Sequence, residues 1–553
     1  MAKMPIGISY FPKVIKEGYY FVDKTKFIAQ LIDNHAGVTL YARPRRFGKT
    51  LGMSMIDSFF NIEQKDEVKT LFEGTYIASA GDEYMSQAGT KPVISLSLKD
   101  IKEDTFPDML KRFGRLLAVL YMQHHTASEQ EGLLEPERAY FQRIEWQKAD
   151  KDDLQDALRN LVDLLARRYR RPVLLLLDEY DAPIQYAWEK GYYDQAISFL
   201  RNFLSAAFKD NPNLDFALVT GVLRIAKESI FSGLNNFKVS TVVSGGFADA
   251  FGFTREEVQK MAADLHREEK LPEIAAWYDG YDFQGVEIYN PWSVISYFDN
   301  HAKAAPYWVN TSGNEILTRL LADVDEIREQ ELQNLLDGGH VTAPIQESVV
   351  YPDIGKNKGD LYTILLLTGY LNCVGVHDDD DMIFYDMAIP NHEIRSIYRR
   401  EILNKLTGKT GISILFDMAE AMEKGQTSRF AAHLKRIILE SVSIYDAAKP
   451  ESFYHGFMLG LTVWLEKKYL VRSNKESGYG RFDLALIPRK DNLPGIIMEF
   501  KAVKTVEELP DAAQKALQQI TDKAYATELH QTGVQTVWTY GIAFSGKHVE
   551  VAS

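Results

Sequence analysis

The chain contains almost no cysteine and no long run of apolar residues. The one cysteine among 553 residues, Cys373, excludes a disulfide within the chain and fits a reducing compartment. No segment approaches the roughly 18 consecutive apolar residues that a membrane-spanning helix needs. Residues 1–7 carry no apolar signal core. We therefore expect a cytoplasmic protein that does not contact membranes.

Glycine and proline are not in excess either, at 36 and 19 residues, so long disordered tracts are not expected. A chain of 553 residues is too long for one hydrophobic core, which predicts about two to four domains. The net charge of −14 repels polyanions at long range. Nucleic acid would therefore have to bind a local basic patch. The most basic cluster, residues 167–171, is also typical of a solvated helix end.

A Gly-Lys-Thr triplet at residues 48–50 follows a short apolar strand and a tight loop. This order predicts a P-loop, in which backbone N–H groups at a helix start hold phosphate. Lys49 would reach the β- and γ-phosphates of a nucleotide, and Thr50 would bind Mg²⁺. The candidate nucleotide-binding residues of this loop are Arg45, Arg46, Phe47, Gly48, Lys49 and Thr50.

The loop departs from the usual pattern at its first position, where Arg43 replaces glycine and Pro44 follows. Arginine adopts a positive φ less readily than glycine, and proline donates no N–H. A second Gly-Lys-Thr triplet occupies residues 408–410. No apolar strand precedes that copy, so we interpret it as a surface turn.

A second signal lies at residues 172–181, where a continuous apolar strand ends in carboxylates. Such strands belong to parallel sheets covered on both faces, and ligands bind at the carboxyl ends of their strands. Asp178 is placed to hold Mg²⁺ and Glu179 to polarise an attacking water. The alternative is a buried strand whose carboxylates simply meet solvent.

A further buried strand is predicted at residues 213–221 and ends in polar Thr220. A polar group there can contact the γ-phosphate or the attacking water. Arg224 follows, and an arginine in this place can stabilise charge on the transferring phosphoryl group, in its own subunit or in a neighbour's. A structural ion pair is the alternative role of Arg224.

The alternation of strands and helices fades after about residue 255, and we expect a helical subdomain over residues 255–340. Residues 345–400 predict a helix, a hairpin and a helix, which together are winged-helix-like. The hairpin turn contains four aspartates, residues 378–381. We interpret it as a solvated tip rather than a metal site, and its charge argues against a grip on DNA.

A different pattern begins near residue 450. A strand carries Asp483 among apolar neighbours, and the next strand ends in Glu499, Phe500 and Lys501. Alternation along the strand puts Glu499 and Lys501 on one side. Two carboxylates that hold Mg²⁺ and a lysine suit phosphodiester cleavage, and Gln518 on the following helix is a candidate fourth residue. A cross-strand charge pair is the alternative.

These motifs together resemble the bacterial predicted AAA-ATPase-like family, whose members carry a C-terminal PD-(D/E)XK nuclease-like domain. The resemblance covers nearly the whole chain and includes the Arg-Pro-Arg-Arg loop, which is usual in this family. It implies that Lys49 and Thr50 bind ATP, with Asp178 and Glu179 serving metal and water. It also implies a restriction-endonuclease-like core at Asp483, Glu499 and Lys501. The motifs lie at residues 20–25, 43–50, 177–181, 228–236 and 251–254.

We therefore predict an α/β protein of three parts: a P-loop AAA-type ATPase domain (1–255), a helical lid with a winged-helix-like region (256–400) and a nuclease-like domain (401–553). One hypothesis is an ATP-driven, Mg²⁺-dependent enzyme acting on nucleic acid. The other is a nucleotide-dependent switch or partner-binding protein with a silent nuclease-like domain. A homo-oligomer is compatible with both.

Overall fold

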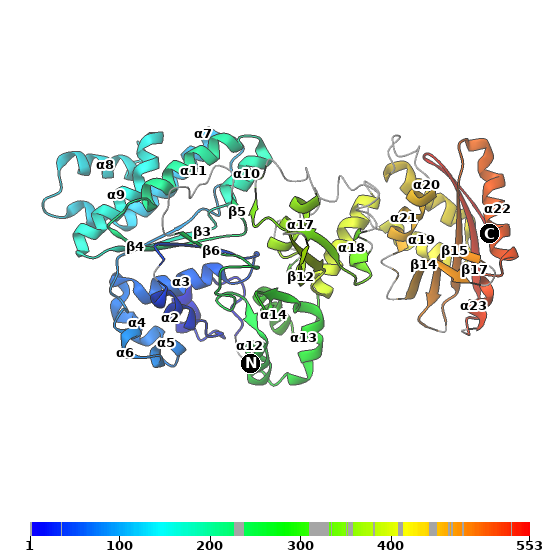
Figure 1. Cartoon of the computed structure of the whole chain (residues 1–553), viewed down its shortest axis with the longest axis horizontal. Coiled ribbons are helices and arrows are strands. Elements are labelled where there is room, and N and C mark those ends of the chain that lie inside the picture. Colours follow the sequence, from blue (N-terminus) through cyan, green and yellow to red (C-terminus); the bar gives the residue numbers. More distant parts are fainter. Residues whose placement is uncertain are drawn as a thin grey trace. The chain divides into compact units, whose positions relative to one another are not determined.

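A computed structural model of the chain divides into two compact units (Figure 1). The first comprises Met1–Thr311 and Gly338–Ile394, and the second comprises Ser312–Asp337 and Arg395–Ser553. A boundary at residue 255 within the first unit stays a prediction. The structure describes all residues except 1–2, 35, 226–236, 309–330, 333, 350, 352–357, 380–381, 408–412, 442–450, 463–464, 466–467, 478–479, 491 and 532.

A five-stranded parallel sheet forms the centre of the first unit, in the order β2-β3-β4-β1-β6. The central strands β1 and β3 are buried along their whole length, as strands covered on both faces must be. Because β4 lies between β1 and β3, the segments that follow these three strands meet at one edge. The strands are β1 (Val38–Ala42), β2 (Val93–Ser97), β3 (Val173–Asp178), β4 (Leu214–Gly221) and β6 (Phe237–Ser240).

Helices cover both faces of this sheet. Helix α3 (Lys49–Phe60) lies on one face, and α9 (Lys151–Tyr169) and α11 (Tyr193–Phe208) lie on the other (Figure 1). The other helices of this part are α1 (Phe11–Lys16), α2 (Lys26–Asp33), α4 (Lys65–Leu71), α5 (Tyr76–Ser79), α6 (Asp82–Met85), α7 (Phe106–Gln123), α8 (Glu135–Glu145) and α10 (Ala182–Lys190).

The part of the first unit after the central sheet is mainly helical. It also contains a small antiparallel sheet, β7-β9-β8, that the sequence did not reveal. In β8, buried Tyr281 and Phe283 flank exposed Asp282, an alternation too short to stand out as a strand. The elements are β7 (Phe253–Thr254), α12 (Arg255–Asp264), α13 (Leu271–Tyr278), β8 (Tyr281–Phe283), β9 (Val286–Tyr289) and α14 (Pro291–Asp299).

A helix, a hairpin and a helix then follow, in the order predicted from the sequence. They are α17 (Lys358–Leu367), β12 (Asn372–Asp379), β13 (Met382–Ala388) and α18 (His392–Thr407), and β10 (Val341–Pro344) adds a third strand beside β13. The outer end of the hairpin includes exposed Asp378 and Asp379. Helix α18 begins in the first unit and continues into the second.

The second unit is built on a mixed sheet in the order β14-β15-β16-β17-β18, in which only β16 and β17 are parallel. Its strands are β14 (Tyr469–Ser477), β15 (Gly480–Pro488), β16 (Gly495–Ala502), β17 (Val537–Ser545) and β18 (His548–Ala552). Its helices after α18 are α19 (Ser413–Glu423), α20 (Thr427–Ser441), α21 (Glu451–Thr462), α22 (Leu509–Asp522) and α23 (Ala526–Gln531). The two sheets confirm the predicted fold class.

Gly541 in β17 allows α22 to lie unusually close to this sheet. A Cβ at residue 541 would lie 2.2 Å from the carbonyl oxygen of Ala513 and 2.4 Å from the backbone nitrogen of Leu517. Both atoms belong to the backbone of α22, so the helix itself would have to shift. The close approach matters because α22 carries a side chain that binds the carboxylate of Glu499.

Substitution of Gly541 by alanine should destabilise the second unit by about 1–3 kcal/mol, because the added methyl group overpacks a helix–sheet contact. Calorimetry of the full chain would measure the shift of its unfolding transition. Gly114→Ala is the control, since its Cβ would meet only the Leu154 side chain, at 3.8 Å. Equal effects of the two substitutions would contradict this account.

Candidate nucleotide and nuclease-like sites

The loop between β1 and α3 turns back on itself around the side chain of Lys49. Gly48 precedes the helix with φ 87°, and Arg46 also has a positive φ, 69°. The Lys49 ammonium is buried and donates to the carbonyl oxygens of Arg43 (2.9 Å) and Pro44 (2.8 Å). Burial lowers the pKa of Lys49, and the nearby carboxylates of Glu179 and Asp178 act against that shift. The loop thus supplies a desolvated cation beside an exposed helix start.

Arg43 takes the place of the usual first glycine and has a structural role of its own. Its guanidinium is fully buried and donates to the carbonyl oxygens of Ala42, Ser240 and Phe247 at 2.9–3.1 Å. It also bonds the Ser240 hydroxyl, at 2.9 Å. Burial lowers the pKa of Arg43 to about 10, so the group stays charged at neutral pH. Arg43 therefore fastens the loop to the end of β6 and to the segment that follows it.

Asp178 joins three parts of the chain at the carboxyl edge of the sheet. Its Oδ2 accepts from the Thr50 hydroxyl at 2.7 Å, and its Oδ1 accepts from the Thr220 hydroxyl. Thr50 is the second residue of α3, Asp178 ends β3 and Thr220 lies near the end of β4. The structure thus brings together three residues that the sequence predicted to meet.

Glu179 follows Asp178 in a left-handed conformation, with φ 52°. Burial raises the pKa of Glu179, the charge of Asp178 raises it further, and Lys49 opposes both. A raised pKa makes a carboxylate a stronger base at neutral pH. Asp181 has another task, since it accepts from the backbone N–H groups of Val222 and Leu223, both at 2.9 Å.

The other predicted residues of the loop contact the protein around it. Arg45 donates to Gln185 at 2.9 Å. The guanidinium carbon of Arg46 lies 4.4 Å from the centre of the Trp292 ring. Phe47 is buried beside Tyr281 and Phe283. Arg224 forms with Ile225 the short strand β5 (Arg224–Ile225), which pairs with β11 (Ser348–Val349). Asp181 holds the turn before β5, so it fixes the backbone that leads to Arg224.

The donor set at this edge fits magnesium and phosphate. Mg²⁺ prefers oxygen ligands and keeps several waters, with one or two carboxylates and substrate phosphates completing its shell. Thr50 and Asp178 supply a hydroxyl and a carboxylate 2.7 Å apart. Within the described ranges, no group of three or more His, Cys, Asp or Glu side chains is placed to hold a metal.

The second unit brings Asp483, Glu499 and Lys501 together. The pairing of β15 with β16 aligns Leu484 with Met498, and Asp483 and Glu499 are the neighbours of these two residues in their strands. Asp483 Oδ2 accepts from the Phe500 N–H at 2.7 Å. Lys501 Nζ lies 3.7 Å from Glu499 Oε1, and the Glu499 side chain is only 2% exposed. These residues offer hard oxygen ligands next to a cation, as a Mg²⁺ site for phosphodiester cleavage needs.

Gln518 does not face these carboxylates, which corrects the sequence prediction. Its exposed amide donates to Asp522 at 2.7 Å, whereas the amide of Gln519 donates to Glu499 Oε1. Successive helical residues point about 100° apart, so an error of one residue turns the side chain away. The buried residues Ala512 and Ala516 share a face with Gln519 at spacings of seven and three, a signal that the sequence contained.

His455 is a further neighbour of this site that sequence reasoning missed. Its Nε2 lies 2.9 Å from the backbone carbonyl oxygen of Asp483. The centre of its ring lies 5.9 Å from the centre of the Phe500 ring. The ring thus supports the strand that presents Asp483. A single histidine in a helix gives no sequence signal for such a contact.

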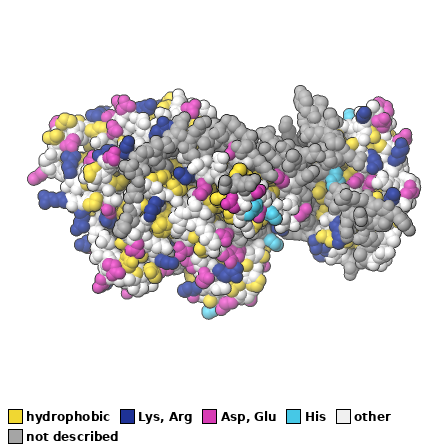
Figure 2. All heavy atoms as spheres, viewed as in Figure 1, with side chains coloured by type: hydrophobic (Ala, Val, Ile, Leu, Met, Phe, Trp, Pro, Cys, Tyr) yellow, Lys and Arg dark blue, Asp and Glu magenta, His cyan; other side chains and the backbone are white. Residues whose placement is uncertain are grey.

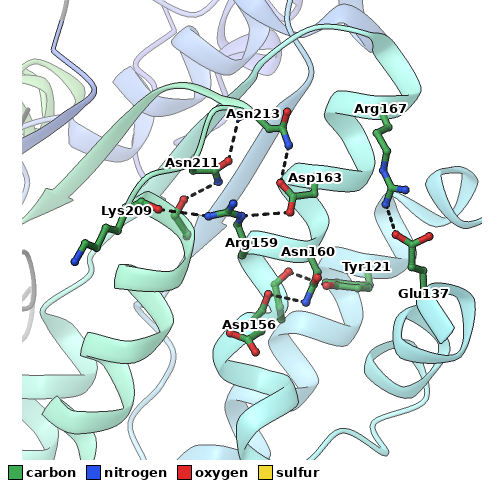
Figure 3. A network of polar contacts seen from close by, with 12 residues as sticks. Tyr121, Glu137, Asp156, Arg159, Asn160, Asp163, Arg167, Lys209, Asn211 and Asn213 are labelled. Carbon is green, nitrogen blue, oxygen red and sulfur yellow. Dashed lines mark hydrogen bonds and ion pairs between the residues drawn. The ribbon is translucent and has the colours of Figure 1, made fainter. Parts of the chain in front are cut away.

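The basic cluster at residues 167–171 is partly engaged within the protein. Arg167 donates to Glu137 at 2.5 Å (Figure 3), and Arg168 donates to the carbonyl oxygen of Thr126 at 2.6 Å. Nearby, Asp163 accepts from Arg159 and Asn213 and so ties α9 to the start of β4 (Figure 3). On the face shown in Figure 2, basic and acidic side chains of the coloured residues are interspersed. In the part of the chain that the structure describes, no helix is long and apolar enough to cross a membrane.

Comparison with known proteins finds a family match for each of two regions of the chain. Residues 5–231 match the family described as a predicted AAA-ATPase, and residues 449–553 match the PD-(D/E)XK nuclease superfamily. These two matches confirm the resemblance drawn from the motifs of the chain. Two predicted segments, residues 228–236 and the second Gly-Lys-Thr copy, lie outside the described residues.

The chain is also similar along its length to a bacterial protein. It is 28% identical to an uncharacterized protein in the vnfD 5′ region of Azotobacter chroococcum mcd 1. The alignment covers 98% of this chain and 96% of that protein. The similarity thus extends over both of the regions that match family models.

Substitution of Gln519 by leucine should lower the free energy of unfolding of the second unit by about 1–3 kcal/mol, because the buried Glu499 carboxylate loses a donor. Gln518→Leu is the matched control, and its exposed position predicts a change within about 0.5 kcal/mol. Chemical denaturation of the full chain would compare the two variants. A larger effect of Gln518→Leu would show that the assignment of the two glutamines is wrong.

Proposed function

We propose that the first unit binds and hydrolyses ATP and that the second unit cleaves nucleic acid with Mg²⁺. The observation that carries the proposal is the pair of hydroxyl contacts from Thr50 and Thr220 to Asp178, at the edge where the P-loop begins its helix. This arrangement supports a magnesium nucleotide as the ligand. The family assignments of the two domains support the same conclusion.

At the nucleotide site, each residue acts on a different part of ATP. The Lys49 ammonium leaves two loop carbonyls and binds phosphate oxygens, which satisfies its charge better in a buried site. Thr50 and Asp178 hold Mg²⁺, which neutralises phosphate charge when bound. Glu179 polarises the attacking water, and Thr220, which bonds Asp178, is the candidate contact to that water or to the γ-phosphate. Arg224 is the candidate for stabilising the transferring phosphoryl group.

At the nuclease-like site, Asp483 and Glu499 are the metal ligands. Mg²⁺ bound there offsets negative charge on the phosphate and acidifies a water. Lys501 positions that water or neutralises the cleaved phosphate. Gln519 is a positioning residue, because its amide fixes the orientation of the Glu499 carboxylate.

A second candidate function is a nucleotide-dependent switch with a silent nuclease-like domain. One observation favours it: the Glu499 carboxylate is buried and already bound by Gln519, with Lys501 beside it. A metal would have to compete with these contacts. The acidic hairpin and the overall charge of −14 also disfavour polyanions. In this case ATP would change assembly or partner binding, and no nucleic acid would be cut.

The Lys49→Ala variant should bind ATP about 10- to 100-fold more weakly, because one charge-assisted contact with phosphate is lost. Titration of purified protein with a fluorescent ATP analogue and Mg²⁺ would measure the dissociation constant. Lys409→Ala, in the second Gly-Lys-Thr copy, is the matched control and should bind as the wild type does. A weaker affinity in the control alone would move the nucleotide site to residues 408–410.

The Lys501→Ala variant should lose about 100-fold or more of Mg²⁺-dependent cleavage while its ATP affinity stays unchanged, because it lacks the cation beside the metal. A panel of single- and double-stranded DNA and RNA, with and without ATP, is the substrate. The exposed neighbour Lys504→Ala is the control and should cut normally.

The same panel separates the two candidate functions. Full cleavage by Lys501→Ala would reject the assignment of this site. Absence of cleavage by the wild-type chain on every substrate would favour the switch. Sedimentation with and without ATP would then have to show a change of mass or shape.

A further inference from the structure

Three successive carbonyl groups of the P-loop are hydrogen-bonded, and they have two different partners. The carbonyl oxygens of Arg43 and Pro44 accept from the Lys49 ammonium. The next carbonyl oxygen, that of Arg45, accepts from the indole Nε1 of Trp308 at 3.3 Å. Lys49 belongs to the nucleotide site, whereas Trp308 follows α14 far along the sequence. One short stretch of backbone therefore connects the site to a distant segment.

Trp308 is also bonded to helix α18. Its backbone N–H donates to Glu393 Oε1 at 2.8 Å, and Glu393 is the second residue of that helix. The second carboxylate oxygen accepts from the Ser293 hydroxyl of α14 at 2.7 Å. Glu393 is fully buried, and this burial raises its pKa to about 7. A buried carboxylate holds its donors firmly, since an unsatisfied one is costly.

The next residue of the loop, Arg46, also contacts a tryptophan. The Arg46 guanidinium lies over the ring of Trp292, and the Trp292 indole donates to the carbonyl oxygen of Tyr307 at 3.2 Å. The ring of Trp308 packs against that of Tyr370, with 5.1 Å between the ring centres. The segment that carries Tyr307 and Trp308 is thus held between the P-loop, α14 and α18.

We propose that Trp308 and Glu393 are positioning residues that link the nucleotide state of the P-loop to helix α18. The proposal rests on the proposed binding of ATP at this loop. When the Lys49 ammonium exchanges two loop carbonyls for phosphate oxygens, the carbonyl groups of Arg43 and Pro44 lose the donor that orients them, directly before the carbonyl group of Arg45. The geometry of the hydrogen bond between the Trp308 indole and the Arg45 carbonyl then changes. Because the Trp308 backbone N–H is bonded to Glu393, the movement of Trp308 also changes the contact with Glu393.

Helix α18 gives this link a consequence for the rest of the chain. Its first residues belong to the first unit, and from Arg395 onward it belongs to the second. The start of the helix is fixed by Asn391, whose Oδ1 accepts from the Ile394 N–H at 3.0 Å, and by Glu393. A change at Glu393 therefore acts on a helix whose later residues belong to the second unit. Contiguous contacts suggest such a route, and measured coupling must establish it.

Hydrogen exchange of α18 amides in the full chain tests the link. In the wild type, a non-hydrolysable ATP analogue with Mg²⁺ should change the exchange of the α18 amides. Trp308→Phe keeps an aromatic ring and loses only the indole donor. The dissociation constant of this variant for the analogue should stay within about threefold of the wild-type value. The variant should nevertheless lose most of the nucleotide-dependent change in the exchange of the α18 amides. A purely structural role of Trp308 would instead alter affinity and folding without removing this dependence on nucleotide.

Trp146→Phe is the matched control, since Trp146 is 59% exposed and belongs to another part of the unit. It should keep both binding and the response of α18. Glu393→Gln, which retains the shape of the side chain, should weaken the response as Trp308→Phe does. If the analogue changes the exchange of the α18 amides in Trp308→Phe as it does in the wild type, the link is wrong. The link is also wrong if the wild-type chain binds the analogue without any change in the exchange of these amides. A wild-type chain that does not bind the analogue at all would overturn the proposed function, and the link with it.

Discussion

The candidate nucleotide site depends on the contacts of the Asp178 carboxylate. Two hydroxyl groups, from Thr50 and Thr220, converge on its two oxygens and so hold the start of α3 against the ends of β3 and β4. The interaction is possible because the sheet order places β4 between β1 and β3. Since the carboxylate is buried, the hydroxyl groups also offset the cost of removing its charge from water. Lys49 and Glu179 then take positions around it.

A comparable constraint organises the second unit. Glu499 and Gly541 are partners in the register of β16 and β17. The missing side chain at residue 541 lets α22 lie against the sheet at this point, and α22 carries the Gln519 amide to Glu499. Helix packing and the orientation of a candidate metal ligand thus have the same cause.

The sequence predicted most of this architecture where the signal was local. The apolar run that ends at Asp178 identified a buried parallel strand, and the Gly-Lys-Thr triplet placed the helix start beside it. The sheet β7-β9-β8 escaped prediction because its strands are only two to four residues long. The choice of Gln518 instead of Gln519 failed although the helical spacing of buried residues contained the answer. The contacts of Trp308 and His455 left no trace in the sequence, because they depend on distant segments meeting.

Arg43 shows that a loop between a strand and a helix can be held in place without the glycine that is usual at this position of a P-loop. Glycine at that position normally makes room by having no side chain. Here a large side chain is folded inward, and its guanidinium anchors the loop to the backbone after β6. A loop anchored in this way inherits its shape from a neighbouring strand as well as from its own backbone preferences. A pattern that requires glycine at the first position of the loop would therefore not find this chain, because Arg43 stands there.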